Sequence, residues 1–214
     1  MKQRGVYRGA KTMLSIVSLE REINNFEMYC NITQDYFKSL NINHITGNLR
    51  NENPVEWIMH LDTYSHELPL ILNHSLLISL FAFFENHLNL ICSYLQKQSG
   101  IMISVTDIKG SGIKRAQTYL KKVIQIDFPD STDEWMKIRN CIPIRNCIVH
   151  CGGNVEQSSK PEELRKSIDN FKIQEVFESR NNLIIINKRL ILALICAIKS
   201  VLISLYSIVN ESTK

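Results

Sequence analysis

The scarcity of turn-forming residues constrains the fold of this chain more than any other feature. Only 8 glycines and 5 prolines occur in 214 residues, about half the usual frequency of each. Because few positions can interrupt a regular element, the elements must be few and long. Apolar residues recur at helical spacing along much of the chain, so we expect an all-α fold.

Several segments have the signals of individual helices. The predicted helices cover about residues 12–40, 67–98, 113–126 and 188–210. A further helix is predicted from a capping box formed by Ser131 and Glu134 to the glycines at 152 and 153, and another begins at Pro161. Residues 175–177 and 183–186 predict a small β-hairpin inserted between helices.

The domain organisation is inferred from a change in composition. Residues 41–54 are rich in Asn and contain one Gly and one Pro, which predicts a loop or linker. The chain length suits one domain with an extension. We therefore expect residues 1–60 to be a helical N-terminal extension and linker, and residues 61–214 to be the main helical domain.

The charge balance is mildly basic. The net charge is +4, with a pI near 8.7, which permits a nucleic-acid partner without indicating one. The pairs Lys114-Arg115 and Lys121-Lys122 fall on one predicted helix, so we expect a local basic patch there. No apolar stretch directly follows the basic residues 1–11, which argues against a signal peptide.

Residues 190–209 are the only segment whose sequence resembles a membrane span. Lys199 lies at its centre and would cost about 2.5–3.5 kcal/mol on insertion scales. Polar residues also follow helical steps and form a narrow stripe: Arg189, Cys196, Ser200, Ser204, Ser207 and Glu211. A core helix explains this stripe, so we expect a soluble, cytoplasmic protein with no membrane partner.

Three residues near position 150 have the chemistry of a catalytic site. Arg145, Asn146 and His150 interrupt a segment that otherwise has the pattern of a buried helix. Asn146 and His150 are four residues apart and share a helix face, with Arg145 beside it. A fixed cation stabilises developing phosphate charge, and an imidazole transfers protons near neutral pH. This combination suits cleavage of a phosphodiester without a metal or another cofactor.

Structural interpretations of the same residues stay open. His150 could stabilise the end of its helix through the helix dipole, and Arg145 could form a surface ion pair with Glu134 or Asp133. His87 lies on the apolar side of its predicted helix, so we interpret it as a hydrogen-bonded core residue and not as a second base.

A zinc site is a further alternative. Cys141, Cys147, His150 and Cys151 are close together in the sequence. Structural zinc sites usually bring two cysteines from a tight loop, whereas these residues fall on one predicted helix. We therefore expect reduced, partly buried thiols and no metal.

The motif and its surroundings resemble the HEPN superfamily, the higher eukaryote and prokaryote nucleotide-binding helical domains. The segment Arg145-Asn146-x-x-x-His150 matches the common form of the superfamily motif, and residues 144–153 resemble the helix end that contains it. Residues 79–88, with Phe84-Glu85, resemble an upstream helix of the family. The resemblance covers about residues 67–210.

This resemblance implies an up-and-down helical bundle and a metal-independent endoribonuclease acting on RNA. It implies a homodimer in which both copies of the motif line one cleft, and a role as a toxin or anti-phage effector with an antitoxin or ATPase partner. Arg145 and His150 carry over as catalytic residues, Asn146 as the residue that orients Arg145 or the substrate, and Glu85 as an acidic partner near Arg145.

The alternative function is a non-catalytic helical module. Such a module would dimerise and bind a partner protein or nucleotide. Family members of that kind often lack the complete Arg-Asn-x-x-x-His motif, which this chain has. The sequence therefore favours the enzyme.

Overall fold

The computed structural model describes residues 15–40, 51 and 53–211 of the chain. Its α-helices are α1 (Ile16–Ser39), α4 (Pro54–Asp62), α5 (Leu68–Ser99), α6 (Gly112–Tyr119), α7 (Asp133–Cys151), α8 (Pro161–Asp169) and α9 (Lys188–Glu211). Shorter helical turns are η1 (Thr63–Glu67), η2 (Val105–Asp107), η3 (Leu120–Ile124) and η4 (Val155–Gln157). The strands β1 (Val176–Glu178) and β2 (Ile184–Ile186) form an antiparallel pair.

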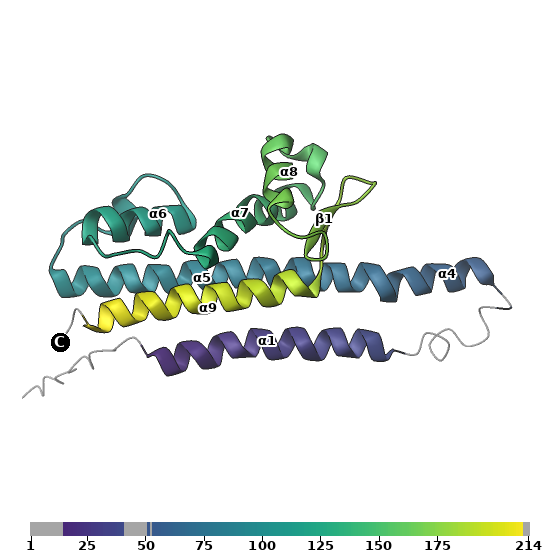
Figure 1. The fold of residues 1–214 in the computed structure, drawn as a ribbon, viewed down its shortest axis with the longest axis horizontal. Coiled ribbons are helices and arrows are strands. Elements are labelled where there is room, and N and C mark those ends of the chain that lie inside the picture. Colours follow the sequence, from purple (N-terminus) through teal and green to yellow (C-terminus); the bar gives the residue numbers. More distant parts are fainter. Residues whose placement is uncertain (1–14, 41–50, 52, 212–214) are drawn as a thin grey trace, which may run out of the picture.

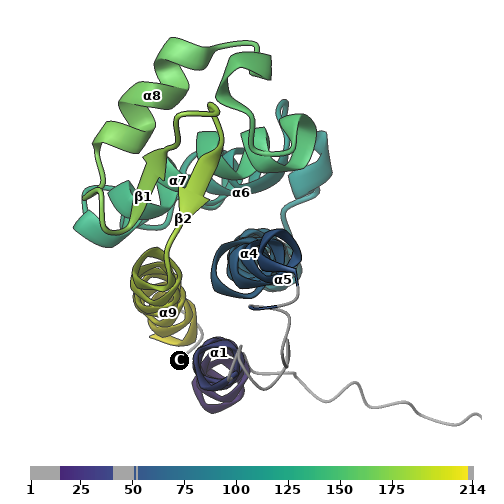
Figure 2. The same ribbon diagram turned by 90° about the vertical axis from the view of Figure 1, so that its right-hand side faces the viewer.

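Long helical segments run side by side along the molecule (Figure 1). One is the continuous helix formed by α4, η1 and α5, and the others are α1 and α9. The shorter elements α6, α7 and α8 and the hairpin lie on the side of α5 and α9 that faces away from α1 (Figure 2). The predicted all-α fold and its small β-hairpin are confirmed.

The helix ends follow the sequence signals, with one correction. Gly100 and Gly152 end α5 and α7 in the left-handed conformation, at φ values of 68° and 59°. The predicted capping residue of α7, Ser131, is wrong by one position. Thr132 caps this helix instead, because its hydroxyl oxygen accepts a hydrogen bond from the Trp135 N–H at 3.2 Å.

The predicted extension is described only in part. Residues 1–14 and most of the predicted linker at 41–54 lie outside the described residues. The helix expected within the extension is α1, and it packs along α5 and α9. Its buried residues Leu19, Ile23 and Cys30 belong to the same core as the long helices.

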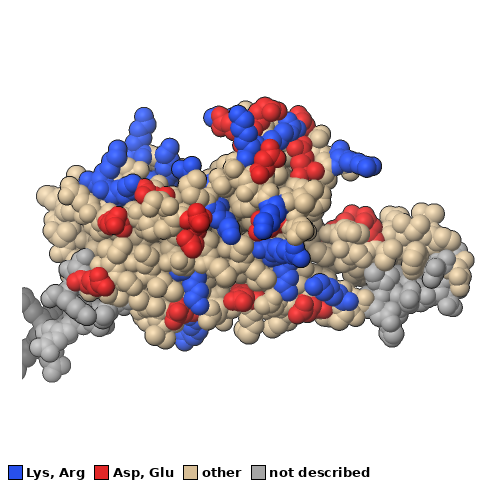
Figure 3. All heavy atoms as spheres, viewed as in Figure 1, with Lys and Arg blue, Asp and Glu red and all other residues tan. Residues whose placement is uncertain are grey.

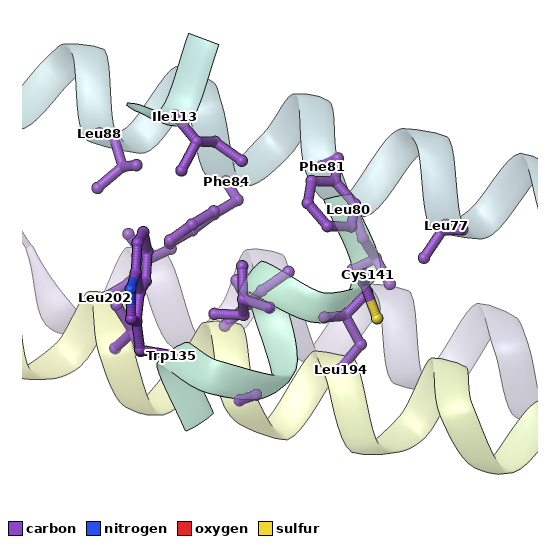
Figure 4. Close-up of a cluster of buried hydrophobic side chains, with 14 of the residues drawn as sticks. Leu77, Leu80, Phe81, Phe84, Leu88, Ile113, Trp135, Cys141, Leu194 and Leu202 are labelled. Atoms are coloured by element: carbon purple, nitrogen blue, oxygen red, sulfur yellow. The ribbon is translucent and has the colours of Figure 1, made fainter. Parts of the chain in front are cut away.

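The central core lies where α7 meets α5 and α9 (Figure 4). Phe84 of α5 and Trp135 of α7 are almost fully buried, with ring centroids 6.3 Å apart. Phe128 packs edge-on against Trp135 at 4.8 Å. These aromatic contacts fix the amino end of α7 on the long helices.

A polar network ties α1 to the rest of the bundle. The Gln34 side-chain amide donates to Asn73 Oδ1 at 2.7 Å, and Asn73 Nδ2 donates to the Ile186 carbonyl at 2.7 Å. Gln34 and Asn73 are both buried. Three separate elements (α1, α5 and β2) are therefore joined by hydrogen bonds within the core.

Two described helices are long and apolar enough to cross a membrane, namely Pro54–Ser99 and Lys188–Glu211. The expectation of only one such segment, residues 190–209, is therefore wrong. Half of the most apolar window of α9 is buried inside the bundle. Lys199, near its centre, donates to Asn24 Oδ1 of α1 at 3.2 Å. A core helix passes the same test of length and composition, so the structure is compatible with a soluble protein.

His87 is a buried core residue, as the sequence predicts. Its Nδ1 lies 2.7 Å from the Tyr206 hydroxyl, and its Nε2 lies 3.4 Å from Oε2 of Glu22. The Phe83 ring packs against the imidazole at 4.3 Å. Burial lowers the pKa of His87 below its ordinary value, although Glu22 acts in the opposite direction. Burial likewise lowers the pKa of His74.

The packing of α1 predicts which of its isoleucines stabilises the protein. Ile23→Ala should lower the free energy of unfolding by about 2–5 kcal/mol, because Ile23 is fully buried. Ile32→Ala on the same helix is the matched control and should change it by about 0.5 kcal/mol or less, since Ile32 is exposed. Urea denaturation measures both. Equal effects would contradict the packing of α1 on the bundle.

The buried His87 and the half-buried His74 predict a loss of stability in mild acid. Their pKa values are lowered in the folded protein, so the unfolded chain binds protons first as the pH falls below about 6.5. The free energy of unfolding should therefore be smaller at about pH 5.5 than at about pH 7.5 in urea denaturation. His87→Gln should reduce this difference, whereas Ile32→Ala, which removes no titratable group from an exposed position, should leave it unchanged. An equal pH dependence in the two variants would contradict the assignment.

Candidate functional site

The carboxyl end of α7 is fixed by the hairpin and by α5. The Ile184 N–H donates to the Gly153 carbonyl at 2.9 Å, and the Val155 N–H donates to Asn182 at 2.8 Å. Gly153 has a φ of 83°, and a Cβ at this position would lie 3.2 Å from Cε1 of His74. Only glycine fits here without displacing a neighbour. The last turn of α7 is thereby held close to the α5 surface.

The three motif residues lie on the last two turns of α7. Asn146 and His150 are exposed, and Arg145 is half-buried. Nη1 of Arg145 donates to Oδ1 of Asn146 at 3.0 Å, while its buried Nε has no hydrogen-bond partner. The Asn146 side chain is therefore in direct contact with the guanidinium.

The guanidinium of Arg145 forms no ion pair with any described residue. This includes Glu134 and Asp133, the partners considered in the structural interpretation of Arg145. The His150 side chain likewise forms no hydrogen bond or ion pair with the described part of the chain. Both groups are thus available to a ligand.

Two cavities flank Asn146. The first, which we call the Arg145 cavity, has a volume of about 350 Å³ and lies between α5, the start of α6 and α7. The second, which we call the His150 cavity, has a volume of about 340 Å³ and lies between α7 and α8. Asn146 lines both, whereas Arg145 lines only the first and His150 only the second.

Glu85 lies in the Arg145 cavity but is not paired with Arg145. Its carboxylate packs against Gly112, where a Cβ would lie 3.3 Å from Oε2. Gly112 has a φ of 56°, so both its conformation and its contact with Glu85 favour glycine. The structure brings Glu85, Arg145 and Asn146 to one cavity, with no ion pair within 4.0 Å between Glu85 and Arg145.

The His150 cavity has a polar wall from α8 and the loop before it. Ser158, Ser159 and Ser167 line it. Lys160, also on the wall, pairs with Glu163 at 2.9 Å. Arg165 connects this wall to the hairpin by two hydrogen bonds to Glu178, at 2.9 and 3.0 Å. The lining of this cavity therefore combines serine hydroxyl groups with the imidazole of His150.

Of the three cysteines near the motif, Cys147 and Cys151 are neighbours that both line the His150 cavity. Cys141 is fully buried in the core. The Cys147 thiol donates to the Asn154 carbonyl and the Cys151 thiol to the Gln157 carbonyl, each at 3.3 Å. Burial raises the pKa of Cys147 to about 11 and that of Cys141 to about 12. Among the described residues, no group of three or more His, Cys, Asp and Glu side chains is arranged to hold a metal ion.

A larger cavity, of about 790 Å³, lies away from the motif between α1, η1 and the start of α9. Its buried amides, Gln34 and Asn73, already bond to each other and to β2. Because the motif residues line the smaller cavities and have unused donors, we place the candidate site at α7.

Part of the Arg145 cavity is not predicted by the sequence. Residues 110–112 and Lys114 line this cavity together with Arg145 and Asn146. They are about 30 residues away in the sequence, and the Gly-Ser-Gly segment lacks the pattern of a phosphate-binding loop. Only the packing of α6 against α5 brings them beside Arg145 and Asn146, so no local sequence signal could have found them.

Comparison with family models, curated proteins and solved structures gives no match to this chain. The resemblance to the HEPN superfamily therefore rests on the motif residues and stays a prediction.

Proposed function

We propose that this chain is a metal-independent endoribonuclease that cleaves RNA at the end of α7. The observation that carries the proposal is the state of the motif residues: a half-buried guanidinium without an acidic partner, an amide in direct contact with it, and an exposed imidazole. An unpaired cation of this kind favours a ligand with negative charge.

The proposed chemistry follows from these groups. The RNA 2′-hydroxyl attacks the adjacent phosphorus, and the 5′-oxygen of the next nucleotide leaves. His150 acts as general base or acid, a role typically worth about 10²–10⁴-fold in rate. Arg145 stabilises the extra negative charge that develops on the phosphorus oxygens. The products are a 2′,3′-cyclic phosphate and a 5′-hydroxyl, and no metal or cofactor is required.

The separation of Arg145 and His150 supports a site shared by two chains. Five residues at about 100° each place these side chains about 140° apart around the helix axis. They accordingly line different cavities on the two sides of Asn146. One imidazole also cannot readily perform both proton transfers. We propose a homodimer in which two α7 ends face each other across a two-fold axis.

The proposed setting is a cytoplasmic toxin or anti-phage effector. An uncontrolled ribonuclease would harm its own cell, so the activity needs restraint by an antitoxin or an ATPase partner. This setting rests on the resemblance of the motif, and the neighbouring genes test it.

A second candidate function rests on a different observation. The outward face of α1 exposes large apolar side chains, including Met28, Tyr29, Ile32 and Tyr36. Contiguous apolar surface favours a protein partner. A non-catalytic binding module would use this face and would leave RNA intact, so a cleavage assay separates the two candidates.

His150→Ala should abolish RNA cleavage and leave the fold unchanged. His150 is exposed and bonds to no described residue, so its removal should change the free energy of unfolding by about 1 kcal/mol or less. Gel analysis of cleavage products and urea denaturation measure the two effects. His66→Ala, at another exposed histidine, is the matched control and should keep full activity.

Unfolding of the His150→Ala protein would instead make His150 a structural residue. Cleavage by the unaltered protein should also persist in excess EDTA. Loss of activity on chelation, restored by zinc or magnesium, would contradict the metal-independent mechanism.

The two-chain site predicts how activity depends on assembly. Activity should fall on dilution as dimers dissociate, because mass action sets the amount of dimer. A mixture of Arg145→Ala and His150→Ala proteins should regain part of the activity if one Arg145 and one His150 from different chains suffice. No regain would mean that each chain must supply both groups, and full activity of a monomer at nanomolar concentration would exclude the shared cleft.

A further inference from the structure

The surface of α6 and η3 carries a concentration of positive charge. From Lys109 to Lys122 the chain has five cations and no carboxylate. Four of these residues are exposed, namely Lys109, Lys114, Lys121 and Lys122. Figure 3 shows Lys and Arg side chains gathered over the part of the molecule that α6 occupies in Figure 1. We call residues 109–122 the α6 basic surface.

Most of this charge is not neutralised within the described part of the chain. Lys121 pairs with Asp130, but Lys109, Lys114 and Lys122 form no ion pair with a described residue. The half-buried Arg115 also has an Nε without a hydrogen-bond partner. Because like charges repel, several cations without acidic partners on one surface disfavour one another in the free protein. A polyanion would relieve this repulsion.

The α6 basic surface is continuous with the candidate site. Lys114 lines the Arg145 cavity, together with Gly110, Ser111 and Gly112 at the start of α6. Glu85 is the only carboxylate among the lining residues, against the two cations Lys114 and Arg145. The cavity therefore has a net positive charge. Lys114 belongs both to this cavity and to the α6 basic surface, so the positive charge continues from the cavity along α6.

We propose that the α6 basic surface binds the phosphate backbone of single-stranded RNA and leads the strand into the Arg145 cavity. Lys114 contacts the phosphate next to the one that Arg145 binds, and Lys109 and Lys122 contact phosphates farther along the strand. Contacts of this kind are independent of base sequence and release counterions, which makes affinity depend strongly on salt. The inference rests on the proposed function in taking Arg145 as the marker of the scissile phosphate.

An anionic membrane is the other polyanion that a basic surface could bind. Met102 is 94% exposed and Ile103 is 49% exposed, and Ile103 accepts a hydrogen bond from Tyr119 at the end of α6. Apolar residues beside a basic helix can insert into a lipid surface. The continuity of the basic surface with a cavity that holds Arg145 and Asn146 favours RNA, and vesicles serve as a separate arm of the test.

The experiment compares two pairs of charge-removing substitutions in the full chain, each combined with His150→Ala so that the RNA stays intact. Lys114→Ala/Lys122→Ala removes two cations from the α6 basic surface. Arg21→Ala/Lys38→Ala removes two exposed cations from α1, on the opposite side of the bundle. Both pairs change the net charge equally, and exposed positions of this kind rarely affect folding.

The probe is a fluorescein-labelled single-stranded RNA of about 20 nucleotides, longer than the strand that a small binding site usually covers. Fluorescence anisotropy gives the dissociation constant at several salt concentrations between about 50 and 200 mM. The logarithmic salt slope of a single strand is about 0.7 per phosphate contact, so the α6 pair should reduce the slope by about 1.4. The α1 pair should leave the slope unchanged.

Equal salt slopes for the two pairs, or no measurable RNA binding at low salt, would overturn the inference. Tighter binding to phosphatidylserine vesicles than to RNA, lost in the α6 pair, would also overturn it and assign the surface to a membrane. Cleavage by the protein with His150 intact is measured separately. RNA binding through α6 without any cleavage would refute the proposed function and leave this inference standing. Cleavage together with a salt slope that the α6 pair leaves unchanged would support the proposed function and overturn this inference.

Discussion

The burial of α9 is the constraint on which the rest of the structure depends. Eleven of its 24 residues are buried, and α1, α5 and α7 all pack against it. A helix with this much apolar surface is unstable in water unless other helices cover it. Each covering helix then has a fixed position. Trp135 and Ile138 are buried residues of α7, the helix that also bears Arg145 and His150. The packing of α7 against α9 therefore determines where these two motif residues lie.

In the candidate site, one side of α7 is packed in the core and the other side exposes polar side chains. The core side of α7 is fixed by aromatic contacts at its start and by the hairpin at its end. The opposite side bears Asn146 and His150 at the surface. Catalytic groups on a well-packed helix lose little entropy when they engage a substrate, because their backbone is already ordered. This arrangement suits a site in which the side chains are already positioned before the substrate binds.

Helices and their ends could be predicted from the sequence because the signals are local. The spacing of apolar residues gave the helices that became α1, α5 and α9, and Gly152 marked the end of α7. The predicted cap of α7 is wrong by one residue, since Ser131 and Thr132 can both cap a helix and only the tertiary geometry selects Thr132.

The composition of the site could be predicted only in part. Arg145, Asn146 and His150 are close in the sequence, so a single helix brings them together. The division into two cavities and the contribution of Lys114 depend on where α6 and α8 pack, which no local pattern records. Glu85 was expected beside Arg145 and does share its cavity, but the contact of its carboxylate with Gly112 is a property of the tertiary structure.

The hydrogen bonds from Gln34 through Asn73 to Ile186 have a consequence for the smallest unit that can fold. A fragment starting at residue 61 would lack Gln34 and would open the surface that Leu19 and Ile23 cover. Oδ1 of Asn73 would lose its donor, and the side chain that holds β2 would be exposed to water. Since β2 anchors the end of α7, the loss of Gln34 would loosen the helix that bears Arg145, which lies more than 100 residues after Gln34 in the sequence.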